Sequence, residues 1–181
     1  PFRTAEGSEL AALFTTQEIS FRLSLIADLT MITADIALAV LFYILLRAAG
    51  EVLALWVLIL RLLQAAIIAV SVMLLAGVPG LIVSGQLDLA SFMIDLHGIG
   101  YDVGLLFFGF NSLLMWRLLR LSGGVPALLA AGIGLSGVVY ISGSLLRLTL
   151  PDALPMFETA YLLPLVAETS LCLWLLTKAR V

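Results

Sequence analysis

Residues 52–76 read VLALWVLILRLLQAAIIAVSVMLLA, a run of 25 residues that is almost entirely apolar. A helix needs about 20 mostly apolar residues to cross the hydrocarbon layer of a bilayer. This stretch exceeds that length, yet it carries Arg61 and Gln64 near its middle. It therefore predicts a membrane-spanning helix with a charge at the depth where a charge is most costly.

The composition of the whole chain agrees with a membrane protein. Its 181 residues are 62% hydrophobic and 12% charged, with a mean hydropathy of +1.19. Soluble domains average about 45–50% apolar and about 25% charged residues. The formal net charge of −3 supplies no basic surface for nucleic acid. We therefore expect the lipid bilayer as a partner and no nucleic acid.

Cysteine and histidine are too scarce for several kinds of site. The single cysteine, Cys172, excludes an internal disulfide and is interpreted as a small buried hydrophobe. The single histidine, His97, excludes a metal or haem site with several histidine ligands in this chain alone. We expect no metal site and predict no cofactor, while a bound lipid, quinone or pigment stays open.

The apolar stretches predict an all-α fold, a polytopic transmembrane helical bundle in a single domain over residues 1–181. Five spanning helices are expected, at residues 19–46, 52–76, 103–119, 125–148 and 161–176. Gly77, Pro79, Gly80 and Gly85 are expected to end the second of them. The segment 86–96 is too short and polar to cross and predicts a helix in the interface, and 8–18 predicts a short surface helix.

Charges in the short loops predict the orientation, because cytoplasmic loops carry an excess of Lys and Arg. One side has Arg47, Arg117, Arg120, Lys178 and Arg180, and the other has Arg3, Arg22 and Arg147. The C-terminus is then cytoplasmic, in a bacterial inner membrane, and the acidic start of the chain lies outside. Because such a start needs something to carry it across, and Pro1 is not a methionine, we expect a sixth helix upstream.

Four helices each place a polar residue in one central layer. At about 1.5 Å per residue from the cytoplasmic ends, these residues lie at ~14–18 Å depth. They are Asp35, Arg61, Asn111 and Glu168, with Gln64 one turn from Arg61. A lone charge at such depth costs at least about 2.5–3.5 kcal/mol, so it is usually paired and is a candidate functional residue. Arg61 should therefore contact Asp35 or Glu168.

A second polar layer is predicted nearer the outside, at ~24–29 Å by the same count. It holds Asp28, Asp102 and Tyr140, with Arg22 and Arg147 just beyond. Together the two layers could form a polar path from the outer surface to the midplane. Gly132 and Ser136, with Gly134 and Gly137 on neighbouring faces, predict close helix packing instead of chemistry.

The central layer has three interpretations. A buried arginine between two carboxylates can be a staple that fixes helix pairing. It can also be a ligand or proton site, or some of the charges can reach the headgroups. One arginine with two acids leaves an excess negative charge, so a carboxyl is protonated or a cation or donor completes the site.

Two stretches resemble a known family. The run 104–114, GLLFFGFNSLL, is followed by Arg120, Gly123 and Pro126, and 162–178 reads LLPLVAETSLCLWLLTK. These features resemble the uncharacterised bacterial multi-pass family "domain of unknown function 4386", and the resemblance covers nearly the whole chain. It implies the topology, including a further upstream helix, and no activity. Family members often carry a histidine where this chain has Asn111, which speaks against metal or haem binding there.

Two functions fit these patterns. The first, which the small loops and glycine-rich helix faces favour, is a structural or accessory subunit with a protein partner in a larger membrane complex. The second is a small carrier or membrane-embedded enzyme that uses a midplane site of Asp35, Arg61 and Glu168. The chain shows no paired broken helices, which many ion-coupled carriers have at their sites. No catalytic residue is predicted, and whether the protein is an enzyme stays open.

Overall fold

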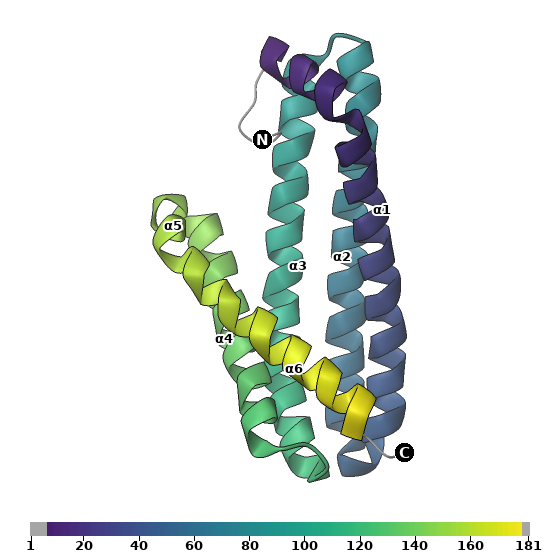
Figure 1. Cartoon of the computed structure of the whole chain (residues 1–181), viewed down its shortest axis with the longest axis vertical. Coiled ribbons are helices and arrows are strands. Elements are labelled where there is room, and N and C mark those ends of the chain that lie inside the picture. The colour runs from purple at the N-terminus through teal and green to yellow at the C-terminus, as the bar shows by residue number, and fades with distance from the viewer. Residues whose placement is uncertain (1–6, 179–181) are drawn as a thin grey trace. The chain divides into compact units, whose positions relative to one another are not determined.

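The computed structural model describes residues 7–178, and these residues form helices joined by short turns (Figure 1). No strand occurs among them, so the all-α prediction is confirmed. Arg3 and Arg180, which enter the predicted orientation, lie outside the described residues.

Helix α1, Gly7–Leu46, is two helices joined at a kink at Gln17, whose φ of −123° and ψ of 23° are not helical. No proline causes the kink. The hydroxyls of Thr15 and Thr16 bond to carbonyls one turn back, at 2.9 and 3.1 Å, and such back-bonding bends helices. The short first helix expected from the sequence is present. It is not merely a surface element, because Leu10 is fully buried.

A one-turn 3-10 helix, η2 (Arg47–Ala49), leads from α1 into α2, Glu51–Val83. The expected end of α2 near residue 76 is wrong, because the helix continues through Pro79. A proline removes only one donor, and membrane helices tolerate that loss. The helix ends at Val83, and Gly85 just beyond it has a left-handed φ of 75°. There the amide of Gln86 bonds to Leu81 O at 2.9 Å, the pattern of a glycine-terminated helix.

Helix α3, Leu87–Ser122, is continuous. The prediction of a separate interfacial helix at 86–96 is therefore wrong. Gly98 and Gly100 do not break the helix, and Gly100 allows close packing against α2. A Cβ at Gly100 would lie 2.7 Å from the Cβ of Ser71.

The last third of the chain starts with a turn at Gly123, whose φ is 66°. Helix α4, Ala127–Thr149, follows Pro126. Short turns come next, in the order η3 (Pro151–Ala153), α5 (Leu154–Phe157) and η4 (Glu158–Tyr161). They lead into α6, Leu162–Lys178.

Five of these helices, α1, α2, α3, α4 and α6, are long and apolar enough to cross a membrane. Many of their large apolar side chains are exposed, among them Leu128 and Leu165. Apolar side chains in such numbers on the outside suit a bilayer as the solvent. The protein is therefore a membrane protein with an apolar helical bundle.

The chain divides into two compact units. Unit 1 holds Pro1–Asp35 and Ala65–Tyr101, and unit 2 holds Ile36–Gln64 and Asp102–Val181. Unit 1 has two apolar clusters, one around Leu10, Val78 and Ala90 and one around Ile68. The core of unit 2 joins side chains of α1, α2, α3, α4 and α6. The prediction of one domain over residues 1–181 stays a prediction.

Candidate functional site

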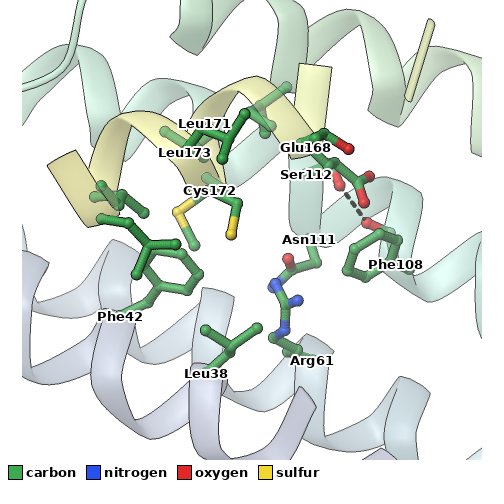
Figure 2. A pocket seen from close by; sticks show the side chains of 15 residues that line it. Leu38, Phe42, Arg61, Phe108, Asn111, Ser112, Glu168, Leu171, Cys172 and Leu173 are labelled. Carbon is green, nitrogen blue, oxygen red and sulfur yellow. Dashed lines mark hydrogen bonds between the residues drawn. The ribbon is translucent and has the colours of Figure 1, made fainter. Parts of the chain in front are cut away.

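Unit 2 contains a pocket with a volume of about 500 Å³, which Figure 2 shows from close by. Residues of α1, α2, α3, α4 and α6 line it, and most are apolar. The polar and sulfur-bearing ones are Arg61, Asn111, Ser112, Met115, Glu168, Thr169 and Cys172. Ligand pockets usually measure about 300–1,000 Å³ and combine apolar walls with a few placed polar groups. This pocket has both properties.

Arg61 supplies the positive charge of the pocket from the middle of α2. Its guanidinium carbon lies 5.0 Å from the ring centre of Phe108 and 5.8 Å from that of Phe42. An aromatic ring face attracts a cation within about 6 Å, most strongly where water is excluded. The two rings thus help to hold the guanidinium in the pocket (Figure 2).

Asn111 and Ser112, both on α3, bond to backbone carbonyls. The Nδ2 of Asn111 donates to Val57 O at 2.6 Å, and the hydroxyl of Ser112 donates to Phe108 O at 2.9 Å. Asn111 is only 1% exposed, so this bond satisfies a buried amide and ties α3 to α2. Val57 lies one turn before Arg61 on α2, so the bond helps to fix the pocket wall from which Arg61 extends.

Glu168 brings a carboxyl group to the pocket from α6. Its Oε1 accepts a hydrogen bond from the hydroxyl of Tyr140 at 2.9 Å. The Tyr140 ring packs edge-on against Phe108, with 5.2 Å between ring centres. Tyr140, on α4, thus orients the carboxyl of Glu168. Its ring packs on Phe108, the same ring that lies beside Arg61.

Asp102 and Arg147 form an ion pair between α3 and α4. Their Oδ1 and Nε atoms lie 3.1 Å apart, with 7% of the Asp102 side chain and 27% of the Arg147 side chain exposed. By contrast, the pair Glu18 and Arg22 on α1 is largely exposed. In the first pair Asp102 is buried, while Arg147 near the end of α4 stays partly exposed.

The polar residues predicted from their depth in the membrane do not all line the pocket. Arg61, Asn111 and Glu168 line one pocket, whereas Gln64 is buried on α2, outside the described lining. Asp28 and Asp35 belong to unit 1, so a contact between Asp35 and Arg61 stays a prediction. Tyr140 and Glu168, which were assigned to different layers, are in contact.

Sequence reasoning missed the role of Cys172. The interpretation as a buried hydrophobe is wrong, because the thiol is exposed and Cys172 lines the pocket. Its spacing of four residues from Glu168 places both on one face of α6. That spacing was the signal available in the sequence.

Unit 1 has a smaller polar group of its own. The Nδ1 of His97 lies 3.1 Å from Ser71 O, which requires a proton on Nδ1 for a hydrogen bond. The hydroxyl of Tyr101 donates to the sulfur of Met31 at 3.4 Å, and the rings of His97 and Tyr101 pack edge to face. These contacts fasten α3 to α1 and α2.

Glycines on α4 pack inside unit 2. A Cβ on Gly137 would meet Gly109 O on α3 at 2.7 Å, and one on Gly132 would meet the Cβ of Ala167 on α6 at 3.1 Å. The side of Gly134 is covered by Trp116. The close packing predicted for this helix therefore takes place within the chain.

No group of three or more potential metal ligands occurs within residues 7–178 as far as they are described. A search of curated proteins and a search of solved structures found no match. A comparison with protein families matches residues 2–179, nearly the whole chain, to one family. The chain therefore belongs to the family described as "Domain of unknown function (DUF4386)".

Proposed function

We propose that this membrane protein binds an amphiphile with an acidic head group in the pocket of unit 2. The observation that carries the proposal is the position of Arg61, a cation between two aromatic rings on the wall of an apolar pocket. A guanidinium presents five N–H donors in a planar fork, which suits carboxylate and phosphate oxygens. The head of the ligand is therefore placed at Arg61.

The apolar part of the ligand has a matching surface. Leu171, Leu173 and Leu176 of α6 line the pocket together with Leu38 and Phe42 of α1. Burying apolar surface contributes about 25 cal/mol per Å². A hydrocarbon chain along this wall would add affinity, while Arg61 would select the head group.

Glu168 constrains the ligand further. An acidic head and an ionised Glu168 in one pocket would repel each other. The proposal therefore includes a protonated Glu168 in the bound state. Tyr140 donates a hydrogen bond to Oε1 of this carboxyl, and it can do so whether the carboxyl is ionised or protonated.

Cys172 provides the test, because it is the only cysteine and lines the pocket. The rate at which N-ethylmaleimide modifies Cys172 is measured in detergent with added oleic acid or oleyl alcohol. These two probes share one hydrocarbon chain and differ in the head group. We expect oleic acid to slow labelling at lower concentration than oleyl alcohol, and Arg61→Leu to remove the difference.

The matched control is Leu165→Cys in a Cys172→Ser background. Leu165 is exposed two turns away on α6, outside the described lining of the pocket. Its labelling should respond equally to both probes. Equal protection of Cys172 by the acid and the alcohol, or protection that survives Arg61→Leu, would refute the proposal.

An accessory subunit in a larger membrane complex is the second candidate. It is favoured by a shallow surface hollow of about 460 Å³, lined by Trp56, Leu121 and Arg117 among others, where a partner could bind. The α4 glycines weigh against it, because they pack against other helices of this chain and are not available to a partner protein. Purification in mild detergent should yield a stoichiometric partner that Trp56→Ala releases; a chain that purifies alone would exclude this candidate.

For location, the proposal is a bacterial cytoplasmic membrane with the C-terminus inside. The support is the charge count of the short loops, led by Arg47, Arg117 and Arg120. A reporter enzyme that is active only in the cytoplasm, fused after Val181, should be active. An inactive fusion at normal expression would reverse the orientation.

A further inference from the structure

One face of α4 carries a row of polar side chains that the pocket alone does not explain. Tyr140, Ser144 and Arg147 follow each other at spacings of four and three residues, so they share one helix face. The row covers about 10 Å along the helix at 1.5 Å per residue. It leads from the end of α4 toward the pocket.

Both ends of the row are anchored to charged groups of unit 2. At the end of α4, Arg147 is partly exposed and pairs with Asp102 at 3.1 Å. At the other end, the hydroxyl of Tyr140 donates to Glu168 at 2.9 Å. The row therefore links a group in contact with the exterior to the carboxyl of the pocket.

Ser144, in the middle of the row, is fully buried. Its hydroxyl has no hydrogen-bond partner among the described residues. An unsatisfied buried hydroxyl costs about 1–3 kcal/mol, so such groups usually hold an internal water. The ring of Tyr161 packs beside it on Gly143, where a Cβ would collide with the hydroxyl of Tyr161.

Ser144 and Tyr140 are neighbours on one face of α4. Side chains four residues apart on a helix have Cβ atoms about 5–6 Å apart, so a water bound to Ser144 lies on the same face as Tyr140. A buried water needs two to four polar partners. The hydroxyls of Tyr140, Ser144 and Tyr161 offer them here.

We infer that this row is a proton path that delivers a proton from the Arg147 end of α4 through Ser144 and Tyr140 to Glu168. A hydronium at the exposed end gives up its proton, each water and hydroxyl on the way accepts one proton and releases another, and the Glu168 carboxylate becomes a carboxylic acid. No electron moves and no bond other than O–H bonds forms or breaks.

The inference rests on the proposed function, because it gives the pocket the neutral Glu168 that an acidic ligand requires. The titratable and charged groups that the described residues place around the carboxyl include Tyr140 on α4, Arg61 on α2 and Cys172 on α6. A neutral Glu168 lets an acidic head group bind at Arg61 without repulsion between two negative charges. Proton uptake and ligand binding are then coupled at one site.

The test follows Glu168 without any ligand, so its failure is distinct from failure of the binding proposal. The purified protein is acidified rapidly, and the infrared band of a protonated carboxyl is recorded over time. Glu168→Gln assigns the band. A positioned proton-transfer group typically contributes about 10²–10⁴-fold in rate, so we expect Ser144→Ala to slow the band at least about a hundredfold.

Ser136→Ala is the matched control. Ser136 is also fully buried on α4, but its hydroxyl is satisfied by Gly132 O at 2.9 Å, so this variant should keep the wild-type rate. Tyr140→Phe, which keeps the ring, should slow the band as Ser144→Ala does and decides the matter if Ser144→Ala is unstable. Wild-type rates in both relay variants, or no Glu168 band in the wild type, would overturn the inference.

Discussion

The crossing of α3 and α4 at Gly109 and Gly137 determines how closely the walls of the pocket approach. A Cβ on Gly137 would lie 2.7 Å from Gly109 O and 3.1 Å from the amide nitrogen of Leu113. Both are backbone atoms, so no side chain can turn away, and the two helices must separate. We therefore predict that Gly137→Ala destabilises the protein.

The size of the effect follows from comparison with Gly77→Ala. Nothing lies within 4 Å of a Cβ at Gly77, so this variant gains only the helix preference of alanine, about 0.5–1 kcal/mol. Gly137→Ala gains the same preference but meets overpacking, which costs about 1–3 kcal/mol. The difference in unfolding free energy between the two variants is therefore about 1–3 kcal/mol, because the preference cancels.

Thermal unfolding in detergent, followed by circular dichroism, measures this difference. On the scale of globular domains of this size, 1 kcal/mol shifts the melting temperature by about 2–4 °C. Gly137→Ala should therefore melt roughly 2–12 °C below Gly77→Ala. Equal melting temperatures, or a higher one for Gly137→Ala, would refute the described crossing of α3 and α4.

Two further changes test the polar contacts around the pocket by the same melting assay. Asn111→Ala should lower the unfolding free energy by about 1–3 kcal/mol, because it removes the buried hydrogen bond to Val57 O on α2. A loss below the error of the assay would contradict that bond. Asp102→Asn should cost about 1–3 kcal/mol because Arg147 loses its partner on the buried side. Glu18→Gln, which breaks the exposed pair with Arg22, should cost no more than about 0.5 kcal/mol, so equal losses would argue against the buried character of the first pair.

Composition and helix length were sufficient to predict the helical membrane fold. The apolar run 52–76 could only be a spanning helix, and the same reasoning located all five candidate spans. Helix ends were harder to predict. Pro79 would break an isolated helix, but a membrane helix tolerates it. Gly100 also disfavours an isolated helix, but its missing side chain allows α3 to pack closely against Ser71 of α2.

The sequence predicted the depth of the candidate site residues in the membrane but not the direction in which their side chains point. Counting residues placed Arg61 and Glu168 at one level, and both line the same pocket. Depth alone could not show that Tyr140 reaches Glu168 or that Cys172 faces the pocket. Those contacts depend on which helices are neighbours and on how each is rotated, and neither property is encoded in a residue count.

Native mass spectrometry of the protein with oleic acid shows whether an acidic amphiphile is held at Arg61. The wild type and Arg47→Leu, whose changed arginine is exposed in η2 outside the described lining of the pocket, should each carry one bound oleic acid. Arg61→Leu should carry none under the same conditions. Retention of oleic acid by Arg61→Leu at the wild-type level, or no binding to the wild type, would contradict the binding of an acidic amphiphile at Arg61.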